Sequence, residues 1–132
     1  VVARIVPSSF AARLNARTDI APRVRAEATQ DLAAALRGAS GLVHATPTGM
    51  GKMPGLPLPV QLLHTKLWVA DAVYVPIETA LLTAARACGC ATLDGGGMAA
   101  GQAAGAFRLF ARQEPDVVRM YGHLRRMLQI SA

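Results

Sequence analysis

The sequence of 132 residues is poor in aromatic, cysteine and acidic residues, and each shortage narrows what the chain can be. Aromatic residues make up only 5%, and no nucleic-acid-binding motif is present, so we expect no nucleic-acid partner. The two cysteines, Cys88 and Cys90, do not make a disulfide framework, and the scattered histidines give no metal-ligand spacing. No apolar run reaches the roughly 18 residues that cross a bilayer, and no secretory pattern opens the chain. We therefore expect a cytoplasmic protein without a membrane partner.

Acidic residues are outnumbered, because 14 lysines and arginines against 8 aspartates and glutamates leave a net charge of +6. Most of this charge lies on arginines outside residues 38–96, a segment that is itself neutral. Three interpretations remain open: solvated basic helix faces, a non-catalytic basic binding module, and arginines that contact nucleotide phosphates.

Short apolar runs alternate with helical patterns along the chain, which predicts βαβ units and a parallel sheet. The strands are predicted at residues 1–6, 23–28, 41–45, 67–73 and 91–94. The helices are predicted at residues 10–17, 32–36 (capped by Thr29 or Asp31), 76–89, 98–111 and 115–128. The strands at 41–45 and 67–73 are almost continuously apolar, so we expect them to be adjacent, parallel and buried on both faces.

Three of these strands end just before distinctive loops, which begin at Thr46, Tyr74 and Gly95. Ligands of open parallel sheets bind beyond the carboxyl ends of the strands. We therefore expect the three loops to gather at one edge of the sheet.

The first two loops carry polar groups that suit a ligand. Thr46 precedes Pro47, which favours an extended backbone whose hydroxyl and amide groups can face a ribose or nicotinamide. The same residues also suit a plain tight turn. Tyr74 can hydrogen-bond a substrate oxygen while its ring stays packed, although an ordinary half-buried tyrosine is the alternative. Asp71 falls inside the strand, so we expect it to be buried, hydrogen-bonded and structural.

The third loop is rich in glycine and leads into a helix. Glycines from Gly95 onward let a ligand approach the backbone at a helix start, but they do not form the dinucleotide fingerprint. Gln102 is the only polar side chain between Met98 and Phe107, so either backbone groups or a polyhydroxylated ligand must satisfy its amide. Gly101 and Gly105 lie four residues apart and predict a flat face for close packing.

Four motifs together resemble the carboxy-terminal half of shikimate and quinate 5-dehydrogenases. They are A-T-P-T-G-M at 45–50, D-A-V-Y at 71–74, D-G-G-G-M at 94–98 and M-A-A-G-Q-A-A at 98–104. The resemblance runs from about residue 14 to the end. It implies an α/β fold, an incomplete Rossmann-like three-layer sandwich with a mostly parallel sheet and carboxy-terminal helices. Residues 1–132 would then form a truncated NAD(P)-binding domain, and residues 98–132 would return toward a substrate domain.

The resemblance also implies an activity, the NAD(P)-dependent reversible reduction of 3-dehydroshikimate or 3-dehydroquinate, with NADP or NAD as cofactor and shikimate or quinate as small-molecule ligand. It assigns the substrate carboxylate to Tyr74 and the ring hydroxyls to Gln102. The implied cofactor contacts are Thr46, Pro47, Ala72, Gly95 and Met98.

Two features depart from the family pattern. The family usually has Asn where this chain has His44. The family's catalytic Lys–Asp pair and glycine fingerprint belong to parts that this sequence does not contain, so we expect little activity from the chain alone. The alternatives are a basic binding module, a decayed enzyme or another Rossmann-type reductase. An exposed strand edge and apolar helix face favour association, for example as a homodimer.

Overall fold

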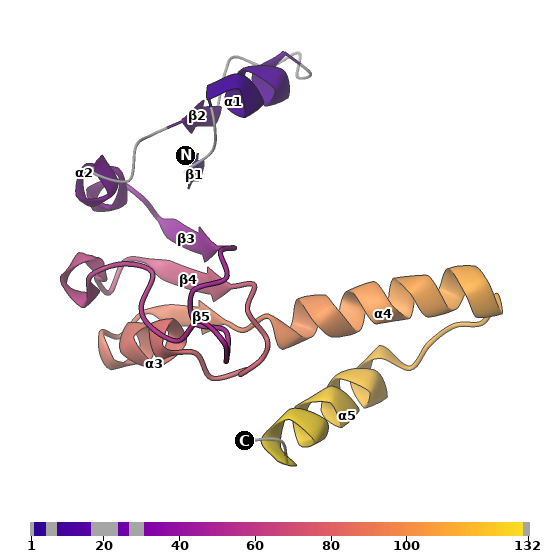
Figure 1. Cartoon of the computed structure of the whole chain (residues 1–132). Helices are drawn as coiled ribbons and strands as arrows, with labels where there is room; N and C mark the ends of the chain where they lie inside the picture. The colour runs from indigo at the N-terminus through magenta and orange to yellow at the C-terminus, as the bar shows by residue number, and fades with distance from the viewer. Residues whose placement is uncertain (1, 5–7, 17–23, 27–30, 131–132) are drawn as a thin grey trace.

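A computed structural model describes residues 2–4, 8–16, 24–26 and 31–130 (Figure 1). Strands and helices alternate along the chain, which confirms the α/β class. The elements are β1 (Val2–Arg4), α1 (Ser8–Asn15), β2 (Val24–Ala26), α2 (Leu32–Arg37), β3 (Gly41–His44), the 3₁₀ turn η2 (Val60–Leu62), β4 (Trp68–Asp71), α3 (Ala80–Ala87), β5 (Ala91–Leu93), α4 (Gly96–Ala111) and α5 (Val117–Ile130).

The described strands form two parallel sheets. Strands β3, β4 and β5 pair in that order, with Val69 of β4 opposite both Leu42 and Thr92. Strands β1 and β2 make a separate parallel pair. The predicted adjacent and parallel pairing of the segments at 41–45 and 67–73 is therefore confirmed.

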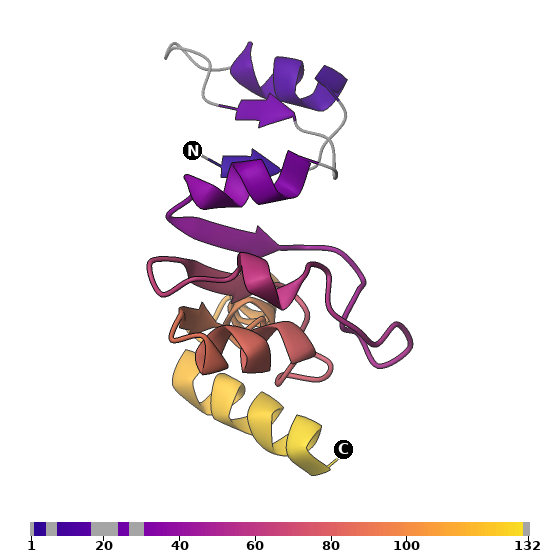
Figure 2. The same cartoon turned by 90° about the vertical axis from the view of Figure 1, so that its left-hand side faces the viewer.

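One face of the β3–β4–β5 sheet carries the core. Val69 points toward α3, whose Leu81, Leu82 and Ala85 are fully buried against it. Figure 2 shows η2 and α3 lying over this face. The expected burial on both faces is wrong, because Val43 and Trp68 on the opposite face are 57% and 47% exposed. Within the described ranges, no helix makes an extended contact with that face.

Helix starts differ from the sequence prediction because side chains from outside the helices cap them. Helix α3 begins at Ala80 rather than Pro76, since the Thr79 hydroxyl accepts a hydrogen bond from the Leu82 amide (3.2 Å). Helix α4 begins at Gly96, where the amide donates to Asp94 Oδ1 (2.9 Å). Asp31 precedes α2 without a capping hydrogen bond from its side chain, and Thr29 lies outside the described residues.

A glycine follows α3 at its carboxyl end. Gly89 adopts a φ of +77°, the left-handed conformation that ends many helices. Cys88 and Cys90 on either side are free thiols. Burial raises the pKa of Cys90, and the neighbouring Cys88 raises it further. The described part of the chain brings together no three His, Cys, Asp or Glu residues that would hold a metal ion.

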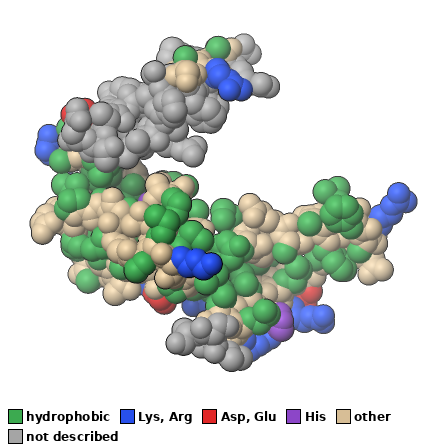
Figure 3. Space-filling view, viewed as in Figure 1, with side chains coloured by type: hydrophobic (Ala, Val, Ile, Leu, Met, Phe, Trp, Pro, Cys, Tyr) green, Lys and Arg blue, Asp and Glu red, His purple; other side chains and the backbone are tan. Residues whose placement is uncertain are grey.

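Helices α4 and α5 form an arm that extends from the sheet and folds back (Figure 1). Arg108 forms a two-pronged ion pair with Glu114 at the turn, and its hydrogen bonds lower the pKa of that carboxyl. The close packing expected at Gly101 and Gly105 is absent, since no described atom lies within 4 Å of an added Cβ. Hydrophobic side chains gather on the arm and over the strands (Figure 3). None of the described helices is both long and apolar enough to span a bilayer.

Candidate functional site

An open pocket of about 310 Å³ lies at the carboxyl ends of β3 and β4. Its walls come from the two segments that follow these strands, so the sheet order itself brings them together. The lining residues are Ala45, Thr46, Pro47, Met50, Ala72, Val73, Tyr74 and Val75. The predicted site residues Thr46, Pro47, Ala72 and Tyr74 are therefore neighbours in one pocket.

The loop after β3 is held in place by backbone hydrogen bonds. The Gly49 amide donates to the Met53 carbonyl (2.7 Å), and the Gly51 amide donates to the Val75 carbonyl (3.2 Å). Gly49 has a φ of +97°, so a side chain there would be strained. These bonds tie the loop to the segment after β4 and set Met50 against the pocket.

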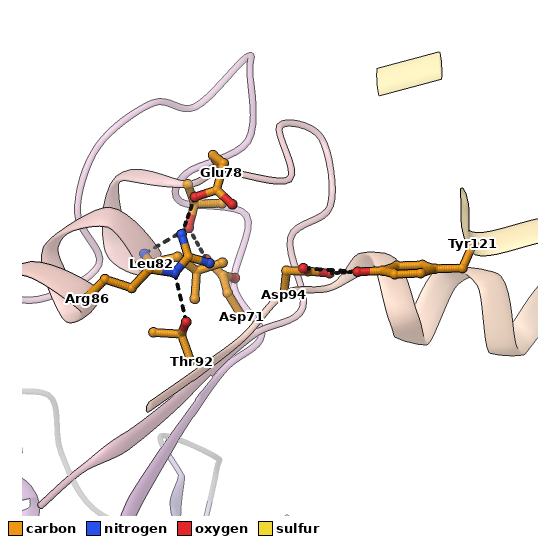
Figure 4. A network of polar contacts seen from close by, with 8 residues as sticks. Asp71, Glu78, Leu82, Arg86, Thr92, Asp94 and Tyr121 are labelled. Atoms are coloured by element: carbon orange, nitrogen blue, oxygen red, sulfur yellow. Dashed lines mark hydrogen bonds and ion pairs between the residues drawn. The ribbon is translucent and has the colours of Figure 1, made fainter. Parts of the chain in front are cut away.

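A buried polar network lies beneath the pocket and begins at Asp71, the last residue of β4, which is 2% exposed. Its Oδ1 accepts from the Val73 amide (3.0 Å), and its Oδ2 accepts from the Thr79 hydroxyl (2.7 Å). Figure 4 labels Asp71 and Leu82, which are linked through the Thr79 hydroxyl that caps α3. The expectation of a buried and hydrogen-bonded Asp71 is confirmed.

His44, the last residue of β3, joins the same network and is only 5% exposed. Its Nδ1 lies 2.9 Å from Asp71 Oδ1, and its Nε2 lies 2.5 Å from the Thr46 hydroxyl. The network therefore connects the start of α3 with a hydroxyl on the pocket wall.

Tyr74 stands at the mouth of the pocket and is 42% exposed. Val73 before it is buried, so the alternation of the extended chain turns the phenol outward. Its exposure leaves the hydroxyl accessible to a ligand. The side chains of Met50 and Val75 add apolar surface beside it.

Gly95, Met98 and Gln102 lie outside the pocket lining and follow the third strand end. Gly95 is packed against the segment that follows β4, because an added Cβ would come within 2.6 Å of the Ala72 carbonyl oxygen and 2.7 Å of that of Val73. Met98 and Gln102 are four residues apart on α4, hence on one helical face, and both are exposed. The exposure of Gln102 argues against a buried amide satisfied by the backbone.

Asp94 anchors this third strand end. Besides capping α4, its carboxylate accepts hydrogen bonds from the Tyr121 hydroxyl, both oxygens at 3.2 Å (Figure 4). The guanidinium of Arg125 lies over the Tyr121 ring, 5.7 Å from its centre. Helix α5 is thereby fastened beside the first turn of α4.

On the outer side of α3, Arg86 pairs with Glu78 and donates to Thr92 (2.9 Å).

Sequence reasoning missed three contributors to this site. Thr79 carried a usable signal, since a threonine before an apolar helical run marks a helix start. Met50 belongs to the A-T-P-T-G-M motif but was not singled out as a contact, and Val75 carried no signal because only the folded loops bring it to the pocket. An apolar pocket with a hydroxyl and a phenol at the ends of parallel strands has the position and chemistry of a small-ligand site in a Rossmann-like segment.

Comparisons with known proteins agree with this class. Shikimate dehydrogenase (NADP(+)) from Streptomyces avermitilis is 60% identical over 98 residues, which make up 74% of this chain and 34% of that protein. The structure of quinate dehydrogenase from Corynebacterium glutamicum in complex with NAD matches with a TM-score of 0.80 and 42% identity, over 94% of this chain and 42% of that one. Ligand-free 5-ketofructose reductase from Gluconobacter sp. strain CHM43 matches with a TM-score of 0.69 and 27% identity, over 90% and 43%.

A comparison with protein-family profiles gives no match. The chain spans about a third of the length of its curated relatives, and the matched part lies in their carboxy-terminal half. The chain belongs to the shikimate/quinate dehydrogenase family and corresponds to that carboxy-terminal portion.

Proposed function

We propose that this chain forms the nicotinamide-facing part of an NAD(P)-dependent shikimate or quinate dehydrogenase. The observation that carries the proposal is the pocket at the ends of β3 and β4, where Thr46, Pro47, Ala72 and Tyr74 meet. Residues 1–132 act as a truncated nucleotide-binding domain in this proposal, and residues 98–132 return toward a substrate domain.

The pocket fits one ring of such a cofactor. Its volume of about 310 Å³ is at the lower end of ligand sites, so it suits a nicotinamide rather than a whole dinucleotide. Pro47 and Met50 offer apolar surface to a flat ring, and the Thr46 hydroxyl offers a polar contact. When bound, the nicotinamide supplies hydride transfer. Gly95 and Met98 are proposed to close the site from the start of α4.

The substrate contacts are proposed for Tyr74 and Gln102. The exposed phenol of Tyr74 can donate a hydrogen bond to a carboxylate. The exposed amide of Gln102 can both donate to and accept from ring hydroxyls. These residues bind and orient the substrate; the Lys–Asp pair that exchanges the proton in the family belongs to a part absent from this sequence.

The 132-residue chain alone is expected to show little turnover of shikimate or quinate with NAD or NADP. A chimera in which this chain replaces the matched segment of the Streptomyces avermitilis enzyme should regain turnover. The absorbance of the reduced cofactor measures the turnover of the isolated chain and of the chimera. A folded chimera that is inactive on both substrates would count against the proposed function, and robust turnover by the isolated chain would contradict the role of the missing groups.

Gln102→Ala in the chimera is expected to reduce kcat/KM by a few-fold to about tenfold, because a hydrogen bond between an amide and a hydroxyl contributes about 0.5–1.5 kcal/mol. Stability should change little, since the side chain is exposed and alanine favours the helix. Kinetics and melting temperature are measured on the same variant. A lower melting temperature with unchanged kinetics would end the substrate-binding hypothesis for this residue.

A second candidate is a reductase of the same fold that acts on a different polyhydroxylated carbonyl compound. The structural match to 5-ketofructose reductase favours it, although at lower identity than the dehydrogenases. Assaying the chimera with 5-ketofructose beside shikimate and quinate separates the two. The first proposal predicts the highest kcat/KM for shikimate or quinate.

A further inference from the structure

His44 is a buried imidazole with both nitrogens engaged, and it lies directly behind the pocket wall. Its Nδ1 faces Asp71 at 2.9 Å, and its Nε2 faces the Thr46 hydroxyl at 2.5 Å. Thr46 is exposed and lines the pocket, whereas His44 does not reach it. Any influence of His44 on a ligand must therefore pass through Thr46.

The partners of Asp71 determine where the ring proton lies. The Thr79 hydroxyl donates its only proton to Asp71 Oδ2, and its oxygen accepts from the Leu82 amide. The Val73 amide donates to Oδ1. Asp71 thus accepts at both oxygens, as an ionised carboxylate does, and the group on Nδ1 of His44 must be a donor.

The direction of the last hydrogen bond follows from this placement. In its neutral form the imidazole carries one proton, which lies on Nδ1 and is donated in the hydrogen bond to Asp71, so that Nε2 keeps a lone pair. The Thr46 hydroxyl then donates its proton to Nε2. Its oxygen keeps lone pairs but no proton for the pocket, so it can only accept there.

We propose that His44 is a positioning residue that fixes Thr46 as a hydrogen-bond acceptor toward the pocket, which selects a ligand group that donates an N–H or O–H. This inference rests on the proposed function for the ligand's identity, because the carboxamide and the ribose of a nicotinamide nucleotide both offer such donors.

The first test locates the ring protons of His44 in the full 132-residue chain. Nitrogen-15 histidine labelling and long-range proton–nitrogen correlation at neutral pH distinguish the states, and His44→Asn identifies the signal. We expect a protonated Nδ1 and an unprotonated, hydrogen-bonded Nε2. Thr46→Val should move only the Nε2 resonance, toward the value of a nitrogen without a hydrogen bond. Thr46→Ser, which keeps the hydroxyl, should leave Nε2 at its hydrogen-bonded value. A proton on Nε2, or an Nε2 signal that Thr46→Val leaves in place, would overturn the proposal.

The second test adds NAD, NADP or the 3-acetylpyridine analogue, which lacks the carboxamide N–H, to the chimera, whose remaining part supplies the glycine fingerprint. Thr46→Val is expected to weaken binding of NAD or NADP by about two- to tenfold. If the ligand's donor is the carboxamide, the analogue binds more weakly than NAD, and Thr46→Val removes this difference in affinity. If the donor is a ribose hydroxyl, Thr46→Val weakens the binding of NAD, NADP and the analogue alike. Thr46→Val without effect would contradict the acceptor role. Failure of every nucleotide to bind would count against the proposed function, while the ring protons still decide the role of His44.

Discussion

Asp71→Ala is expected to lower the free energy of unfolding by about 3–5 kcal/mol, because it removes one partner of a buried polar network. The lost carboxylate leaves the Val73 amide, the Thr79 hydroxyl and the His44 ring without their acceptor. Buried donors without partners are costly, so the loss exceeds that of a single hydrogen bond. Urea unfolding of the full chain measures the difference.

Glu78→Ala provides the matched control for this prediction. Glu78 is also a carboxylate beside α3, but its ion pair with Arg86 is exposed (Figure 4). Exposed ion pairs contribute about 0–1 kcal/mol, so this variant should unfold almost like the original chain. Equal losses in the two variants would contradict the importance assigned to the Asp71 network.

Gly95→Ala is expected to destabilise the chain by about 1–3 kcal/mol, the usual cost of forcing extra atoms into a packed region. The new Cβ would meet the Ala72 and Val73 carbonyl oxygens at 2.6 and 2.7 Å, and these backbone atoms directly follow β4, where the Ala72 amide is held by the His44 carbonyl (2.8 Å). Because Ala72 and Val73 line the pocket, the chimera carrying this change should also lose activity.

Gly97→Ala is the control for this second prediction, since an added Cβ there has no described atom within 4 Å. Alanine in a helix is favoured over glycine by about 0.5–1 kcal/mol, so Gly97→Ala should be neutral or stabilising. Thermal unfolding of the two variants gives the comparison. A Gly95→Ala variant as stable as Gly97→Ala would show that the backbone at Ala72 and Val73 moves aside without cost.

The sequence alone determined the order of the elements and the main outline of the site. Apolar β-forming runs marked β3 and β4, and parallel strands necessarily bring their carboxyl ends to one edge. Thr46 and Tyr74 could therefore be predicted as neighbours, and the structure places both in one pocket. The burial of Asp71 also followed from its position inside an apolar strand.

The tertiary structure decided what depends on contacts between distant segments. The hydrogen bond between His44 and Asp71 joins residues 27 positions apart, and it exists because the strand register sets them side by side. The start of α3 was decided by Thr79, whose oxygen caps the helix while its proton holds Asp71. The exposed side chains of Val43 and Trp68 have the same explanation. An apolar strand pattern indicates that a residue can be buried, but only the tertiary structure decides which face of the sheet another element covers.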